Sequence, residues 1–454
     1  MRCRGVGSRT VLLLAVLGAM LILPSAVHAQ ATGAGVVVDA EGVLAKKLYA
    51  DPGGQLLRAR IAAAKASLDP QLATPSRMRM ISLNRLEDAI RQRQGVPTDE
   101  MRYLAGLLRL EYVFFYPESN DIVIAGPAEG WVTNPAGRVV GINSGRPVVQ
   151  LQDLVVALRA FPPGKGGTSL IGCSIDPTAE GLAKMQDFLR QMGSYATPAD
   201  TRYIVNGLQT SLGLQKISIN GVSPKTHFAQ VLVEADYRMK LIGIGLEQPP
   251  VRLVSYVAKA NPAAVSRNAM QRWFFTPDYE CVCVAEDGLA MQLVGDGVKL
   301  VGENEVVGAG GARQASGLTD KASQTFVNSF TAKYSELADR SPVYAELRNL
   351  IDLAIGAAFI QKADYYGKAG WEMDLLGNEA AFAVETYNVP KTVASAVNAI
   401  WKGRRLMTPI GGGVSIQARQ ALAKENLLDE GKDEVAKVRQ ETKLELAEGQ
   451  WWWN

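Results

Sequence analysis

Histidine is the scarcest reactive side chain in this 454-residue sequence, which has only His28 and His227. We expect His28 to be removed with an N-terminal leader, so a Ser-His-Asp or Cys-His catalytic site would have to use His227. If the alternation of a strand is counted from His227, it shares a face with Ala229, Val231 and Val233. Such an apolar face predicts a neutral, structural histidine rather than a catalytic one.

Cysteine is nearly as scarce: Cys3 lies in the leader, and Cys173, Cys281 and Cys283 follow. Three cysteines form neither a disulfide framework nor a paired zinc pattern. We expect one bridge, from Cys173 to one of the other two, and the spacing does not choose between them. A Cys3-His zinc site with His227 is the alternative. Its ligands would come from three distant segments, so we assign no metal.

A long apolar run occurs only near the start, from Val11 to Leu23, after three arginines and before Pro24. The charged start, the short apolar run and a small-residue cleavage site at Ala29 predict a secretory signal peptide over residues 1–29. The run falls short of the about 20 residues that a membrane anchor needs. We therefore expect a secreted or periplasmic protein, cleaved near Ala29, with no transmembrane segment.

Net charge is also missing once the leader is set aside. The leader holds three of the 48 basic residues and none of the 45 acidic ones, which leaves 45 of each. This balance gives no basic footprint for nucleic acid. The remaining length exceeds what one hydrophobic core usually serves, so two or three domains are expected.

Helical and strand-like segments alternate with hairpins, which indicates a multi-domain α+β protein. The turn at residues 117–120 predicts a hairpin whose core includes Val113, Phe115, Ile122 and Ile124. Asn220-Gly221 predicts a second hairpin, with His227 on its returning strand. Helices are expected over residues 54–68, 83–94, 98–107, 151–161, 179–192, 200–212, 319–337 and 343–366.

These patterns divide the chain into regions. We expect an N-terminal α/β region (30–195), a β-rich central domain (196–307), a Gly/Ala linker (308–317) and a helix-rich C-terminal region with a charged tail (318–454). The tail from Val414 is expected to be largely helical. It ends with three consecutive tryptophans, Trp451 to Trp453. Some of these are expected to be exposed or held by a partner; the alternative is a frayed or self-packed end.

Paired carboxylates are the remaining candidates for chemistry. If the segment from Glu234 is helical, Glu234 pairs with Arg238 and Asp236 with Lys240. The functional alternative is that Glu234, Asp236, Asp278 and Glu280 converge in one pocket and carry out acid/base hydrolysis. The loop "PPGKGGT" and the segment "GAGGAR" fail the phosphate-loop and dinucleotide patterns. We therefore assign no catalytic, cofactor-binding or metal residues.

Four segments of the sequence resemble a known family: "VLVEADYRMKLIGIGLE", "QRWFFTPDYE", "YLAGLLRLEYVFFYPESNDIVIAGPAEGW" and "SPVYAELRNLIDLAI". Together they resemble DUF1598, an exported bacterial family of unknown function found chiefly in planctomycetes. The resemblance implies export and an α+β architecture, and it supplies no activity or site residues.

Two functions from different classes follow. The first is a non-enzymatic extracytoplasmic binding or assembly protein with an unknown envelope or protein partner and no cofactor. The second is a carboxylate-dependent hydrolase that acts on cell-envelope material. Convergence of the carboxylates in a deep cleft would favour the second.

Overall fold

The computed structural model describes residues 31–164, 166–193, 197–260, 269–307, 313–315, 320–398, 400–402, 405–407, 412–430, 434–442, 446–447 and 449–454. The signal peptide expected over residues 1–29 lies outside the described residues. Helices and mixed sheets are both present, which confirms the α+β class.

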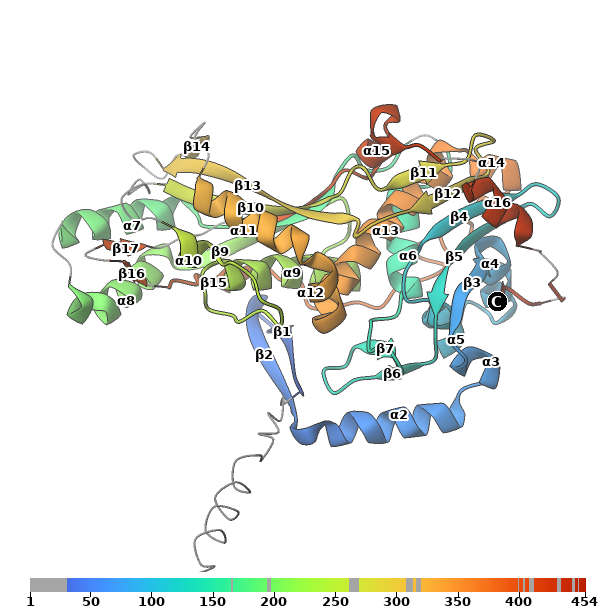
Figure 1. The fold of residues 1–454 in the computed structure, drawn as a ribbon, viewed down its shortest axis with the longest axis horizontal. Coiled ribbons are helices and arrows are strands. Elements are labelled where there is room, and N and C mark those ends of the chain that lie inside the picture. The colour runs from blue at the N-terminus through green and yellow to red at the C-terminus, as the bar shows by residue number, and fades with distance from the viewer. Residues whose placement is uncertain are drawn as a thin grey trace, which may run out of the picture.

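The larger of the two main sheets has nine strands (Figure 1). In spatial order they are β1 (Ala31–Val38), β2 (Val43–Asp51), β15 (Thr392–Ala394), β9 (Leu214–Asn220), β8 (Ile171–Asp176), β18 (Gly412–Ile416), β10 (Ala269–Pro277), β13 (Val298–Val307) and β14 (Arg313–Ala315). Strands from the N-terminal, central and C-terminal regions thus pair within one sheet.

The second main sheet has seven strands: β19 (Leu427–Leu428), β11 (Val282–Val284), β12 (Ala290–Leu293), β4 (Tyr112–Tyr116), β5 (Asp121–Ala128), β3 (Ser76–Ser82) and β20 (Trp452–Trp453). Two short ribbons complete the strands: β6 (Trp131–Thr133) with β7 (Val139–Gly141), and β16 (Ile400–Lys402) with β17 (Arg405–Met407).

The α-helices are distributed along the whole chain: α2 (Gln55–Ser67), α3 (Pro70–Ala73), α4 (Leu83–Gln92), α5 (Asp99–Arg102), α6 (Leu151–Ala160), α7 (Ala179–Met192), α8 (Thr201–Leu212), α9 (His227–Gly243), α10 (Tyr256–Lys259), α11 (Lys321–Ala332), α12 (Tyr334–Arg340), α13 (Pro342–Lys362), α14 (Tyr365–Ala369), α15 (Ala418–Ala421) and α16 (Glu434–Glu441). Short 3-10 turns lie at Pro52–Gly54, Leu104–Gly106, Pro198–Asp200 and Lys424–Asn426.

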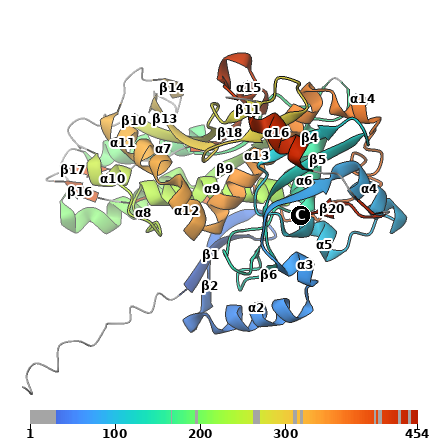
Figure 2. The same cartoon turned by 45° about the vertical axis from the view of Figure 1, so that its right-hand side comes forward.

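Helix α13 forms the centre of the core. It is buried along nearly its whole length, and it packs against α6 and α9. Apolar residues occur on all sides of this helix, and neighbouring elements cover them together with the buried polar residues Glu346, Arg348, Asn349 and Asp352. By contrast, α2 has no buried residue and lies along the outside of the molecule beside the β6–β7 ribbon (Figures 1 and 2). In the described residues, no helix is both long and apolar enough to cross a membrane.

Several local predictions are confirmed. Strands β4 and β5 form the expected hairpin, and its four predicted core residues Val113, Phe115, Ile122 and Ile124 are buried. Helices α2, α6, α7 and α8 lie within a residue or two of their predicted ranges. Helices α11 to α14 confirm a largely helical stretch after residue 320.

The second predicted hairpin is wrong, and this error changes the account of His227. Strand β9 ends at Asn220, but the chain then turns and begins α9 at His227. Thr226 caps this helix because its side chain accepts a hydrogen bond from the Ala229 N–H. From Phe228 to Gly243 the helix is buried on nearly all sides, and only Gln230 and Tyr237 are partly exposed.

One expectation for the C-terminal tail is wrong, and one alternative is confirmed. The first part of the tail is strand β18, and its described residues contain only the short α-helices α15 and α16. Trp451, Trp452 and Trp453 are all buried, which confirms the self-packed alternative for the three tryptophans. Strand β20 pairs antiparallel with β3, and the Trp452 ring lies 5.0 Å from the Arg79 guanidinium. The tail therefore closes the edge of the seven-stranded sheet.

The predicted linker (308–317) lies outside the described residues except at 313–315. Those three residues form β14 and pair with β13. The linker and the regional boundaries therefore stay predictions.

Candidate functional site

A cavity of about 730 Å³ opens beside the N-terminal half of α9. Its walls come from segments far apart in the sequence: the β1–β2 hairpin, the α4–α5 loop, the β6–β7 turn, the start of α6, α9 and the loop at residues 382–387. Small-molecule sites are usually concave pockets of about 300–1,000 Å³. The size and the number of converging segments make this cavity the candidate site.

His227 lines this cavity from the first turn of α9. Its Nδ1 lies 2.8 Å from Oδ2 of Asp153, a buried residue in the first turn of α6. Burial disfavours a charged imidazole, but Asp153 opposes this by charge and hydrogen bonding, and the net result raises the pKa of His227 to about 9. His227 is therefore a protonated ion-pair partner at neutral pH, which corrects the neutral histidine expected on an apolar strand.

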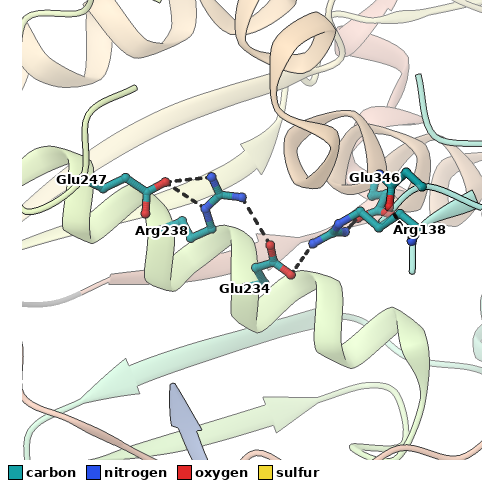
Figure 3. A network of polar contacts seen from close by, with 6 residues as sticks. Arg138, Glu234, Arg238, Glu247 and Glu346 are labelled. Carbon is teal, nitrogen blue, oxygen red and sulfur yellow. Dashed lines mark hydrogen bonds and ion pairs between the residues drawn. The ribbon is translucent and has the colours of Figure 1, made fainter. Parts of the chain in front are cut away.

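Arg138, in the β6–β7 turn, lies between two carboxylates of the core (Figure 3). Its Nη2 is 2.5 Å from Oε2 of Glu234 on α9, and its Nη1 donates to Oε2 of Glu346 on α13. Burial lowers the pKa of Arg138, but the two glutamates outweigh burial and raise it above its ordinary value. The turn is thus joined by charge to both central helices.

The chain of ion pairs continues along α9. Arg238 donates from Nη1 to Oε1 of Glu234 at 3.3 Å and from Nη2 to Oε1 of Glu247 at 2.8 Å. The i, i+4 pair of Glu234 and Arg238 confirms the helical prediction. Lys46 of β2 then lies 2.6 Å from Oε2 of Glu247. Six side chains therefore form one alternating chain, in the order Lys46, Glu247, Arg238, Glu234, Arg138 and Glu346, which we call the ion chain.

The ion chain contains three cations and three carboxylates, and most of these side chains are buried. A buried charge is costly unless it is paired and hydrogen-bonded. Here each charge has an opposite partner, so the chain is compensated within the protein. It joins two walls of the cavity, the β1–β2 hairpin and the β6–β7 turn, to the core helices.

The rest of the cavity lining combines apolar residues, such as Leu151, Val231 and Phe382, with uncharged polar side chains. Three tyrosines line it from separate segments: Tyr49, Tyr103 and Tyr387. Gln152 also lines it and donates from Nε2 to the Tyr387 hydroxyl oxygen at 3.1 Å. The Tyr387 and His227 rings are 5.8 Å apart between centroids. The surface thus combines aromatic faces with donors and acceptors in fixed positions.

A second acid on α9 has a different environment. Lys240 donates to Oδ2 of Asp236 at 2.9 Å, which confirms the other predicted i, i+4 pair. Lys240 also donates to the carbonyl oxygens of Ile175 and Gly412 in the nine-stranded sheet. Burial raises the pKa of Asp236 to about 6, against the opposing effect of Lys240. This pair is closed and does not line the cavity.

The four candidate carboxylates are therefore not brought together. Glu234 lines the cavity, whereas Asp236 faces the sheet. Asp278 lies 2.7 Å from the Lys299 ammonium, and Glu280 is exposed in the loop after β10. The second acid that lines the cavity is Glu385, which the sequence did not single out.

The cysteines are also separate. Cys173, Cys281 and Cys283 are all free and buried, so the expected bridge from Cys173 is wrong. Cys173 lies on β8, Cys281 packs in the main core, and Cys283 packs in a smaller cluster on the seven-stranded sheet. Burial raises the pKa of Cys281 to about 12, which makes its thiol a poor nucleophile. Within the described ranges, no group of three or more His, Cys, Asp or Glu side chains could hold a metal.

Sequence reasoning missed Asp153, Arg138, Glu346 and Glu247. One signal was present: Glu346 lies on α13 in a largely apolar segment, where a charge is expected to be buried and paired. No sequence spacing connects it to Arg138, which is 208 residues away.

No curated protein and no solved structure matches this chain. A family match covers residues 173–256, which run from β8 through α9 to the first residue of α10. The matched segment includes His227, Glu234, Arg238 and Glu247. Residues 173–256 match the family described as "Protein of unknown function (DUF1598)", which is the family that the sequence resembles.

Proposed function

We propose that this protein is an extracytoplasmic, non-enzymatic binding protein and that the cavity beside α9 is its ligand site. The observation that carries the proposal is the cavity itself: about 730 Å³, with walls from six separate segments and a lining of tyrosine rings, amides and paired charges. Such a site binds by shape and hydrogen bonding on a rigid support.

The ionisation of the lining supports binding rather than catalysis. A general base works best when its pKa lies near the operating pH. His227 has a pKa of about 9 and is already protonated at pH 7, so it serves as a donor. Glu234 accepts from Arg138 and Arg238 together, so both of its oxygens are already bonded.

Export is part of the proposal and rests on the leader-like residues 1–29. N-terminal sequencing of protein recovered from the envelope or the medium is expected to begin at or near Gln30. Soluble cytoplasmic protein that retains Met1 would contradict export.

A hydrolase acting on envelope material is the second candidate. It is favoured by one observation: two carboxylates, Glu234 and Glu385, line the same cavity. Hydrolysis of a glycosidic bond uses such a pair, one as acid and one as base or nucleophile. Product release from envelope saccharides, abolished by Glu385→Gln and kept by Glu379→Gln on the same loop, would support this candidate over simple binding.

The binding proposal is tested by ligand-induced thermal stabilisation with soluble saccharide, peptide and lipid fractions of the envelope. A ligand that binds only the folded state raises its melting temperature. The blocking variant is Ala383→Trp, because Ala383 lines the cavity and is exposed, so the indole fills space without disturbing the core. Ala380→Trp is the matched control, since Ala380 is exposed on the same loop and does not line the cavity.

We expect at least one fraction to stabilise the wild-type protein and the control, and not the blocking variant. Stabilisation of Ala383→Trp equal to that of the wild type would show that the ligand binds outside this cavity. Absence of stabilisation by every fraction would contradict the proposed function.

A further inference from the structure

The lining of the cavity also defines the chemical class of the ligand. We infer that it is a neutral, hydroxyl-rich saccharide. This inference rests on the proposed function, because it assigns a ligand to the same cavity.

Charge compensation is the first argument. Arg138 and Glu234 line the cavity, but each is already paired within the ion chain. The protonated His227 is paired with Asp153 in the same way. A charged ligand that paired with any of these three side chains would have to displace its present partner and leave a buried charge uncompensated, which is strongly unfavourable. The remaining charges, Arg102 and Glu385, are exposed and of opposite sign.

Hydrogen-bonding capacity is the second argument. A sugar hydroxyl both donates and accepts, so it suits a wall that offers both functions. The amides of Gln150, Gln152 and Gln230 line the cavity. Gln152 Oε1 is buried and accepts no hydrogen bond from the described residues, although its Nε2 donates to Gln150 and Tyr387. The Gln152 amide therefore leaves one unsatisfied acceptor in the wall of the cavity.

Aromatic surface is the third argument. Tyrosine offers a large apolar face and a polar tip, which suits a surface that is apolar at one end and wet at the other. A sugar ring has the same character, with C–H groups on its faces and hydroxyls at its edge. Tyr49 on β2, Tyr103 after α5 and Tyr387 in the 382–387 loop bring three tyrosines to one cavity from three segments.

The test is a panel of soluble oligosaccharides measured by isothermal titration. Each neutral oligosaccharide of glucose, galactose or N-acetylglucosamine is matched with its uronic-acid and free-amine counterparts. We expect the tightest binding from a neutral member, with at least about tenfold weaker binding of its charged counterparts, which corresponds to about 1.4 kcal/mol.

Two variants of Tyr49 test the aromatic face. Tyr49 is half-buried on the hairpin, so its replacement is expected to leave the core intact. Tyr49→Ala removes the ring and is expected to weaken binding about tenfold. Tyr49→Phe keeps the ring and is expected to change affinity less than about threefold. Equal affinity of Tyr49→Ala and wild type would overturn the stacking argument.

The outcomes separate this inference from the proposed function. Tighter binding of a uronic acid or amino sugar would overturn the neutral class. If no saccharide binds while a peptide or lipid fraction stabilises the wild type and not Ala383→Trp, the saccharide inference fails and the binding function stands. If neither the panel nor any fraction binds, both fail.

Discussion

Helix α9 has two faces that use the same local sequence device in different ways. Glu234 and Arg238 on one face, and Asp236 and Lys240 on the other, are acid-base pairs four residues apart. The first pair extends through Arg138 and Glu247 toward the cavity walls. The second is closed against the carbonyl oxygens of the nine-stranded sheet.

The difference shows that an i, i+4 pair does not by itself define a role. The sheet-facing pair anchors the helix, because Lys240 binds both Asp236 and the carbonyl oxygens of Ile175 and Gly412 in the sheet. The cavity-facing pair positions two walls of a binding site, because it contacts Arg138 of the β6–β7 turn directly and Lys46 of the β1–β2 hairpin through Glu247. The two faces should therefore respond differently to mutation and pH.

Breaking the sheet-facing pair is expected to have the largest effect. Asp236→Ala leaves the buried Lys240 ammonium with carbonyl oxygens alone, and we expect a loss of about 3–5 kcal/mol in the free energy of unfolding. Urea denaturation at pH 7 measures this loss. The double replacement Asp236→Leu with Lys240→Met removes both charges and is expected to recover most of it. A loss below about 1 kcal/mol in the single variant would show that the pair does not anchor the helix.

Breaking the ion chain at its cavity end is expected to have a somewhat smaller effect on stability. Arg138→Met leaves Glu346 without its cation, while Glu234 keeps Arg238, so we expect a loss of about 2–3 kcal/mol. The control is Arg146→Met, because Arg146 and Asp339 form a pair that is exposed on both sides. Its expected cost is about 0–1 kcal/mol. Equal losses in the two variants would mean that Arg138 behaves as a surface residue.

The pH dependence of the free energy of unfolding tests the His227–Asp153 ion pair beside the cavity. In the folded state the His227 pKa of about 9 lies above its ordinary value of 6.5, so the ion pair with Asp153 stabilises the folded state fully below about pH 6.5. This stabilisation is lost as pH rises through about 9, and we expect it to amount to about 1–3 kcal/mol. Urea unfolding at pH 6 and pH 10 measures it. His227→Gln should remove this part of the pH dependence, and an unchanged difference between the two pH values would assign it to other groups.

The far end of the ion chain is expected to have the smallest effect. Lys46 is partly exposed, and Glu247 keeps two hydrogen bonds from Arg238 when Lys46 is removed. Lys46→Met should therefore cost about 0.5–1 kcal/mol by urea denaturation. Lys65→Met on the exposed helix α2 is the control and should be close to neutral. A cost for Lys46→Met as large as that of Arg138→Met would show that the chain acts as one unit.

The sequence predicted local structure well where the signal was local. The β4–β5 hairpin, the ends of α7 and both salt bridges along α9 depend on residues within a few positions of one another. The strand expected around His227 failed because Asn220-Gly221 is a strong hairpin signal and the following residues include several with high strand propensity. The structure instead begins a helix at His227, capped by Thr226.

The site itself was largely beyond local reasoning. Arg138 contacts residues 96 and 208 positions away, and Asp153 contacts His227 across 74 positions. The tryptophan tail depends on a strand pairing with β3, at the other end of the described chain. Such partners are set by the packing of sheets and helices, and a single sequence carries no spacing that identifies them.

The central claim is that the cavity beside α9 binds the ligand. The most direct measurement is isothermal titration of the best neutral oligosaccharide of the panel into wild type, Ala383→Trp and Ala380→Trp. We predict one-to-one binding to wild type and to Ala380→Trp, and no measurable binding to Ala383→Trp. Binding to Ala383→Trp with undiminished affinity, or no binding of any oligosaccharide to the wild type, would contradict the account.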